Sequence, residues 1–285
     1  MYDLVIRGGT IVDGTGDASF VGDLAIEKEK IVQVGGDIGP GEKELDAGGL
    51  LVTPGFVDVH THYDGQATWD QHLTPTGWHG VTTVVMGNCG VGFAPARPDQ
   101  HDWLIQLMEG VEDIPGSALA EGINWDWETF PEYLDALEKF DRSIDIGTQI
   151  PHGAVRAYVM GERSDQVATP DDIEKMSLIV EEALGAGALG FTSSRTMLHR
   201  AKDGEPVPGT FAGHDELMSL GRACGRAGHG VFEISSDFGL GGMHGRFRED
   251  VDWMSALSKE TGLPISFILA QASHHPDEWR EILHW

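Results

Sequence analysis

The pattern of apolar and polar positions changes once along the chain, near residue 54. Before this point, short apolar runs separated by turn-forming residues predict strands at residues 2–7, 10–12, 21–27, 30–34 and 50–53. After it, apolar strands are followed by amphipathic helices, an order typical of βαβ units around a parallel sheet. The pattern predicts an α/β protein with two parts: a small N-terminal β-sandwich segment over residues 1–54 and a barrel domain over residues 55–285.

The second part carries the signature of a TIM-like barrel. Apolar runs predict six strands, at residues 56–60, 82–86, 144–149, 188–192, 230–235 and 264–269. Helical spacing predicts helices at residues 130–140, 169–185, 214–228 and 247–261. A closed (β/α)8 barrel needs about two more units, and the chain ends in an apparent helix, so we expect a C-terminally incomplete barrel. An unusual open fold is the alternative.

Residues 91–129 form a long insertion after the second barrel strand. It shows no strong periodicity, and a loop of this length is more often functional or disordered than incidental. We therefore expect an irregular segment there.

Net charge limits the classes of binding partner, and cysteine content indicates the cellular compartment. Nineteen basic residues against 46 acidic ones give a net charge of −27, so neither nucleic acid nor an anionic membrane is an expected partner. The chain starts directly in a strand and has no run of ~18 apolar residues, and two cysteines are too few for a disulfide framework. We expect a cytoplasmic protein. The sequence does not indicate its oligomeric state.

The first barrel strand ends in two histidines, His60 and His62. Residues i and i+2 of a strand share a face, so both imidazoles can reach one ion, and imidazole nitrogen is a preferred zinc ligand. Cys89 follows the second strand; a lone cysteine is usually a packing residue, but adjacent strand ends lie about 5 Å apart, close enough to share the ion. The pattern predicts a zinc site at the C-terminal ends of the barrel strands.

Two segments resemble the N-acyl-D-amino-acid deacylases (D-aminoacylases) of the amidohydrolase superfamily: PGFVDVHTHYD at residues 54–64 and GVTTVVMGNCG at residues 80–90. The resemblance implies a metal-bearing (β/α)8 barrel, an N-terminal segment completed by strands that return after the barrel, and Zn²⁺ as cofactor. It also implies that Cys89 replaces the carboxylated lysine of dihydroorotases and hydantoinases. The implied reaction is hydrolysis of the linear amide bond of a small-molecule N-acyl amino acid.

The fifth and sixth strands depart from the family pattern, which places a metal-binding histidine near the end of each. Glu233 stands at the first position and could ligate as a carboxylate, whereas the second has no obvious substitute. We therefore predict one tightly bound zinc, held by His60, His62, Cys89 and Glu233. The family's catalytic aspartate follows strand eight, beyond residue 285, so no catalytic residue is assigned.

Four further residues are predicted to face the substrate or support the metal ligands. Arg195, after the fourth strand, could hold a substrate carboxylate through two parallel hydrogen bonds, and Ser194 precedes it. Asp64 could hold a histidine or contact substrate, and His152 is a candidate polar group at the rim.

Two other functions stay open at this point. One is hydrolysis of a cyclic amide, as in hydantoinases and dihydroorotases, which would call for a lysine at the end of the fourth strand; none lies between Lys175 and Lys202. The other is a non-catalytic barrel that has lost its metal, an option that the altered fifth and sixth strands support.

Overall fold

The structure is a computed structural model, which describes residues 1–238 and 246–284. The chain divides into two units, Met1–Phe56 and Val57–Trp285. Among the described residues, no helix has both the length and the apolar character needed to cross a membrane.

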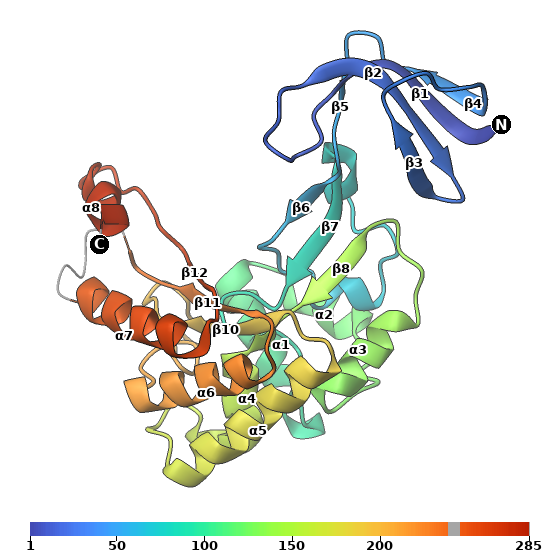
Figure 1. Ribbon diagram of the computed structural model, residues 1–285. Helices are drawn as coiled ribbons and strands as arrows, with labels where there is room; N and C mark the ends of the chain where they lie inside the picture. The colour runs from blue at the N-terminus through green and yellow to red at the C-terminus, as the bar shows by residue number, and fades with distance from the viewer. Residues whose placement is uncertain (239–245, 285) are drawn as a thin grey trace. The chain divides into compact units, whose positions relative to one another are not determined.

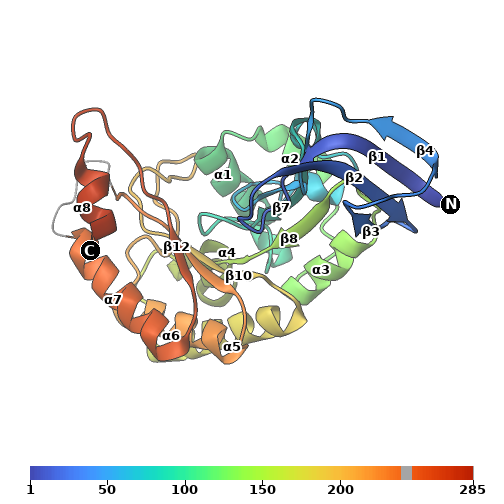
Figure 2. The same ribbon diagram turned by 45° about the horizontal axis from the view of Figure 1, so that its top comes forward.

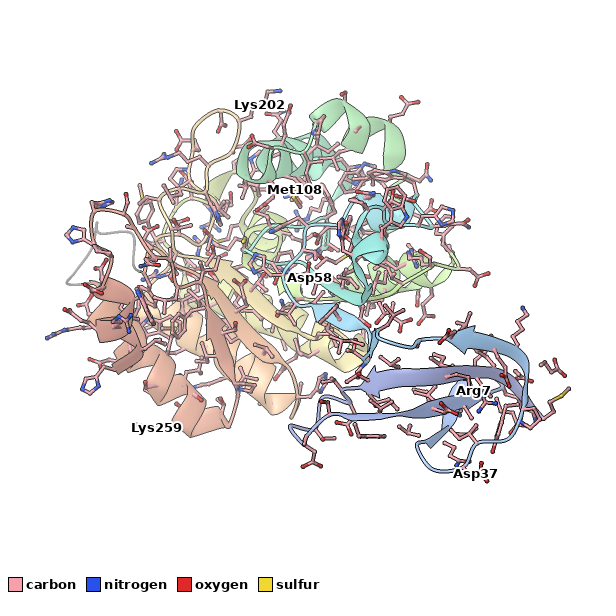
Figure 3. The ribbon with its side chains drawn as sticks, turned by 90° about the horizontal axis from the view of Figure 1, so that it is seen from above. Arg7, Asp37, Asp58, Met108, Lys202 and Lys259 are labelled. Carbon is pink, nitrogen blue, oxygen red and sulfur yellow. The ribbon has the colours of Figure 1, made fainter. Side chains whose placement is uncertain are left out.

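The first unit is a five-stranded mixed sheet. Its strands are β1 (Tyr2–Ile11), β2 (Phe20–Glu27), β3 (Lys30–Val34), β4 (Gly41–Asp46) and β5 (Leu51–Val52). The order is β3-β2-β1-β4, with β2 antiparallel and β4 parallel to β1, and β5 also pairs with β1. Arg7, labelled in Figure 3, ties three strands together because its guanidinium binds Asp23 of β2 at 2.8 Å and Glu44 of β4 at 2.6 Å.

Sequence reasoning placed two strands where the structure has one, and it missed another. The predicted strands at residues 2–7 and 10–12 are both parts of β1, whose register against β2 shifts between Ile6 and Gly9. β4 was not predicted because its side chains are almost all polar and exposed, so it lacks an apolar alternation.

The second unit is built on parallel strands. They are β6 (Phe56–Asp58), β7 (Val81–Met86), β8 (Asp145–Thr148), β9 (Ile150–Pro151), β10 (Gly190–Ser194), β11 (Val231–Ser235) and β12 (Ile265–Phe267). They form two sheet segments, β6-β7-β8 and β12-β11-β10-β9. β8 and β9 are consecutive pieces of one strand, because only Gln149 separates them. The described strands thus occupy six positions of a TIM-type barrel, as predicted.

Helices flank these strands. The α-helices are α1 (His101–Glu112), α2 (Gly116–Gly122), α3 (Phe130–Glu138), α4 (His152–Met160), α5 (Pro170–Ala186), α6 (His214–Arg226), α7 (Arg246–Thr261) and α8 (Glu278–His284). Short 3₁₀ helices span Gln66–Thr68, Thr76–His79, Pro98–Gln100 and Gly161–Arg163. Helices α3, α5, α6 and α7 follow one another along the outer side of the strands (Figures 1 and 2).

Local chemistry explains where the longest of these helices begins. Thr169 caps α5 by accepting a hydrogen bond from the backbone of Asp172, whose carboxylate accepts from the backbone of Thr169 in return. Pro170 occupies the first turn, where its missing N–H costs nothing.

Two expectations about the second unit were wrong. Residues 91–129 are not irregular, because they contain α1 and α2, and α1 buries Leu104, Ile105, Leu107 and Met108 (Figure 3 labels Met108). The apolar run that predicts a strand at residues 56–60 would suit a buried strand, but the strand observed is only Phe56–Asp58, with Phe56 62% exposed and the following Val59 66% exposed. β6 lies at the edge of its sheet segment, with β7 on one side.

The core between the strands and helices includes stacked aromatic rings. Phe191 of β10 and Phe232 of β11 are fully buried, and their ring centroids lie 5.1 Å apart at 6°. Trp253 of α7 meets Phe232 edge to face. Adjacent parallel strands and an outer helix are therefore joined through one aromatic cluster.

We expect Phe191→Ala to lower the free energy of unfolding by about 3–5 kcal/mol, because it leaves a cavity in this cluster. The measurement is chemical denaturation followed by circular dichroism. Phe211→Ala is the matched control, since Phe211 is 61% exposed and its loss should change stability by less than about 0.5 kcal/mol. Equal losses in both variants would contradict the packing role.

Candidate metal centre

A sharp turn after β7 places Cys89. The backbone of Cys89 is left-handed, with φ 58°, and Gly87 before it has φ 80°. A Cβ on Gly87 would collide with the carbonyl oxygen of Gln149, so the close approach of the turn to the neighbouring strand requires glycine there. The Asn88 amide donates to the carbonyl oxygens of Thr61 at 3.1 Å and Val85 at 2.9 Å, which fixes the turn to the chain that follows β6.

The turn brings Cys89 to the two histidines after β6. Nε2 of His60 lies 3.2 Å from Sγ of Cys89, and the rings of His60 and His62 are 5.4 Å apart. One ligand atom from each of the three residues lies within 4.8 Å of the others. The structure therefore assembles three of the four predicted metal ligands into one group.

A second group of possible ligands shares the same cysteine. It consists of Cys89, Glu112 at the end of α1 and His199 in the segment after β10, again with ligand atoms within 4.8 Å of one another. Glu112 Oε1 also lies 3.3 Å from Nε2 of His62. Neither Glu112 nor His199 was predicted. Nothing in the sequence singled out either residue, because Glu112 lies in the insertion without strong periodicity and His199 in the segment after β10.

Glu233 does not join either group of candidate ligands. Its Oε2 accepts a hydrogen bond from the backbone N–H of Cys89 at 3.1 Å, so it supports the turn. Its buried Oε1 has no hydrogen-bond partner among the described residues. Glu233 is thus placed against the backbone of Cys89 and outside both groups of candidate ligands, and its ligation of zinc stays a prediction.

Asp64 is also buried. Burial raises the pKa of Asp64 to about 7, although the nearby backbone amide of Gly87 acts in the opposite direction. Burial likewise raises the pKa of Glu233 to about 8 and that of Glu112 to about 7, while it lowers the pKa of His62 to about 3. Burial and the nearby Glu233 raise the pKa of the Cys89 thiol.

These groups fit a divalent metal ion. Nitrogen, sulfur and carboxylate donors are the set that zinc binds, and ligands about 2.0 Å from a tetrahedral ion lie about 3.3 Å apart. The His62–Glu112 separation of 3.3 Å matches that spacing, and the His60–Cys89 separation of 3.2 Å is slightly shorter than the ~3.5 Å expected when sulfur lies about 2.3 Å from zinc. Nδ1 of His62 and Oδ2 of Asp64 are buried without partners in the described structure, which is the state of polar groups arranged around a missing charge.

Arg195 does not face a substrate site as predicted. Its side chain is 5% exposed, and its guanidinium binds Asp250 of α7 at 3.1 Å and the carbonyl oxygen of Ala212 at 2.8 Å. Ser194 is also buried, and its Oγ lies 3.2 Å from Nδ1 of His199. Both predictions are corrected, since the strand end turns these side chains into the protein.

His152 was expected at the rim but is fully buried at the start of α4. Its Nε2 lies 2.9 Å from Oε1 of Glu216 on α6, and its Nδ1 lies 2.9 Å from Oγ of Ser193. A carboxylate only accepts, so Nε2 carries the proton and Ser193 donates to Nδ1. Arg156 also binds Glu216. Both ring nitrogens thus have hydrogen-bond partners inside the protein, which indicates a structural role for His152.

The chain matches one protein-family model and several characterised relatives. The family model described as "Amidohydrolase family" matches residues 43–284. The D-aminoacylase of Alcaligenes xylosoxydans xylosoxydans is 34% identical over 194 residues, which cover 67% of this chain and 37% of that protein. The N-acyl-D-glutamate deacylase of the same organism is 31% identical over 231 residues, 79% of this chain and 42% of that protein. This chain spans less than half the length of either relative.

Solved structures of deacylases have a similar fold. A D-aminoacylase described as having a binuclear metal centre superposes with a TM-score of 0.73 at 26% identity, over 93% of this chain and 51% of that one. N-acyl-D-glutamate deacylase from Bordetella bronchiseptica, complexed with zinc and a phosphonate inhibitor, superposes with a TM-score of 0.68 at 26% identity, over 93% of this chain and 50% of that one.

The buried His152–Glu216–Arg156 cluster gives a pH prediction. Burial opposes ionisation of Glu216, but His152 and Arg156 outweigh it and lower the pKa of Glu216 to about 2. A carboxyl group whose pKa is lower in the folded than in the unfolded state stabilises the fold above the unfolded value of about 4.3, and this contribution is lost as the pH falls toward 2.

We therefore expect Glu216→Gln to be less stable than wild type at pH 6, with the difference shrinking between pH 5 and pH 2. Denaturation midpoints of both proteins across this range measure it. Glu181→Gln is the control, because Glu181 forms its ion pair with Arg226 at an exposed position. A difference that is constant with pH would contradict ionised Glu216 as the source.

Proposed function

This chain belongs to the amidohydrolase family, and from that premise we propose that it forms the metal-binding part of a hydrolase acting on N-acyl-D-amino acids. The observation that carries the proposal is the convergence of His60, His62 and Cys89 at the ends of neighbouring strands. The names of its relatives support the substrate class, since they act on N-acyl derivatives of D-amino acids.

His60, His62 and Cys89 would hold zinc. When bound, zinc supplies Lewis-acid chemistry, which polarises a carbonyl group and makes water more acidic. The chain's own residues do the positioning: Glu233 holds the backbone of Cys89, and Asn88 fastens the turn to Thr61. Because the strand ends fix these groups before substrate arrives, little reorganisation is needed at the reacting bond.

Two residues proposed to contact substrate now have other roles, which leaves the substrate carboxylate without an assigned partner. Arg195 forms an ion pair with Asp250, and Ser194 contacts His199. Asp64 remains a proposed supporting residue of the metal ligands, because it is buried and its Oδ2 has no hydrogen-bond partner among the described residues. Side-chain specificity is therefore assigned to no residue of this chain.

Hydrolysis of a cyclic amide is the competing function. Hydantoinases and dihydroorotases would carry a lysine after the fourth barrel strand, where this chain has Ser194 and Arg195 and no lysine between Lys175 and Lys202. Cys89 supplies an anionic ligand from the second strand instead. A metal-free scaffold is the third reading. The close spacing of the ligand atoms of His60, His62 and Cys89 argues against it, as does the buried Nδ1 of His62, which has no partner among the described residues.

We expect wild-type protein to retain tightly bound zinc through dialysis, and His60→Ala and Cys89→Ala to lose it, because each removes a ligand from the first group. Elemental analysis measures the content. Cys224→Ala is the matched control, since Cys224 is a buried cysteine on α6 outside both groups. Zinc retained in Cys89→Ala would remove Cys89 from the site.

We also expect the enzyme that contains this chain to release free amino acid from N-acetyl-D-amino acids at least about tenfold faster than from the L-enantiomers. It should not open hydantoin or dihydroorotate. An amine-detection assay with matched D, L and cyclic substrates tests this, and ring opening at a comparable rate would favour the competing function.

A further inference from the structure

We propose that the cavity between the segments that lead into α5 and α6 binds a primary ammonium group that carries an apolar chain. The cavity has a volume of about 310 Å³, and it is lined by residues 165–167 before α5, residues 205–213 before α6, Arg156 and Glu216. The two helices that follow these segments run side by side (Figures 1 and 2). None of the described lining residues belongs to either group of candidate metal ligands, so this site is distinct from the metal centre.

The first observation is a buried carboxylate that keeps one oxygen for the cavity. Glu216 is 3% exposed and lines the cavity. Its Oε1 accepts hydrogen bonds from His152 and Arg156, whereas its Oε2 has no hydrogen-bond partner among the described residues. Buried polar atoms are nearly always satisfied, and an ammonium group brings three N–H donors, so Oε2 marks the place of the head group.

The second observation is the sign of the charge around the cavity. Arg156 is the one basic residue among the described lining residues, and Glu216 balances its charge. Asp165 and Glu205 also line the cavity, are exposed, and form no ion pair within the described part of the chain. The remaining charge is therefore negative, which attracts a cation and repels carboxylates, including the carboxylate of a free amino acid.

The third observation is exposed apolar surface in the same lining. Val167 of the first segment is 91% exposed, and Phe211 of the second is 61% exposed. An alkyl chain that covers these side chains removes apolar surface from water, which favours binding. The ring face of Phe211 also attracts an ammonium group. Carboxylates beside apolar walls therefore select an amine with a hydrocarbon chain over an inorganic cation.

The fourth observation is that the wall before α6 is held in place without a ligand. The guanidinium group of Arg195 donates to the carbonyl oxygen of Ala212 at 2.8 Å. Gly209 has φ 101°, and a Cβ on it would lie 2.6 Å from Nδ1 of His152, so the segment passes directly against this buried histidine. A site that is already formed loses less conformational entropy when its ligand binds.

The test is NMR titration of the full chain with n-butylammonium at pH 7, where the amine is protonated. We expect saturable binding, with backbone shifts centred on residues 165–167 and 205–213. Affinity should be at least about tenfold higher than for 1-butanol, which has the same chain but no charge. Butyrate should not bind, and added salt should weaken n-butylammonium binding because it screens the exposed carboxylates.

Variants of the lining locate the bound amine. Glu216→Gln should weaken n-butylammonium binding at least about tenfold, because it removes the charge that faces the head group. Glu205→Gln and Asp165→Asn should each weaken it about 2–5-fold, as should Phe211→Ala, whose exposed side chain matters little for stability. Glu174→Gln is the matched control, since Glu174 is an exposed glutamate of α5 outside the lining and should bind like wild type. Circular dichroism confirms that each variant is folded.

The source of the ammonium group is tested with a tripeptide that has one central lysine and blocked ends. Tighter binding of n-butylammonium assigns the site to a free amine, and tighter binding of the peptide assigns it to a lysine side chain of another protein. Both results support the site, because the recognised group is the same.

The outcomes separate this site from the zinc site. His60→Ala should lose zinc and still bind n-butylammonium like wild type. A folded His60→Ala variant that no longer binds the amine would place the ammonium group at the metal centre and overturn the distinct site. An affinity for n-butylammonium no higher than for 1-butanol would overturn it too, as would an affinity that Glu216→Gln and Phe211→Ala leave unchanged, and either result would leave the zinc site standing.

Discussion

The turn at residues 87–90 is the constraint on which the rest of the second unit depends. It crosses the ends of the central strands so closely that Gly87 faces the carbonyl oxygen of Gln149. Three residues of the turn donate hydrogen bonds to other segments. The Asn88 amide donates to the carbonyl oxygen of Thr61, and the backbone N–H of Cys89 donates to the carboxylate of Glu233. The backbone N–H of Gly90 donates to Oγ1 of Thr192 at 3.1 Å. Strands that are neighbours through their ladders are therefore also joined through one loop.

The second unit also contains two buried ion pairs. Arg195 with Asp250 and Arg156 with Glu216 are ion pairs whose side chains are at most 4% exposed. Removing one partner from such a pair leaves an unpaired buried charge, which costs more than the pair contributes. Buried partners of this kind explain why polar side chains at the end of β10 point into the protein. Ser193 contacts His152, and Arg195 binds Asp250 of α7.

Sequence patterns predicted what depends on local periodicity. The parallel strands follow from apolar runs, the helices α3, α5, α6 and α7 from helical spacing, and His60 and His62 from their two-residue spacing on one strand. Cys89 follows from its place after the next strand together with the family resemblance of the segment around it. Sequence patterns could not predict the direction in which the side chains that follow each strand point. Arg195 and His152 follow strands in the expected places, yet packing directs both inward. Glu112 and His199 meet only because α1 fits the segment after β10, a contact no spacing encodes.

The contact between Cys89 and Glu233 joins residues 144 positions apart. Closing a chain segment of this length costs conformational entropy, so the contact depends on the pairing of the strands that lie between the two residues. The position of the Cys89 backbone is therefore tied to the arrangement of the strands from β7 to β11. A metal ion that binds Cys89 only in the folded state would in turn stabilise this arrangement.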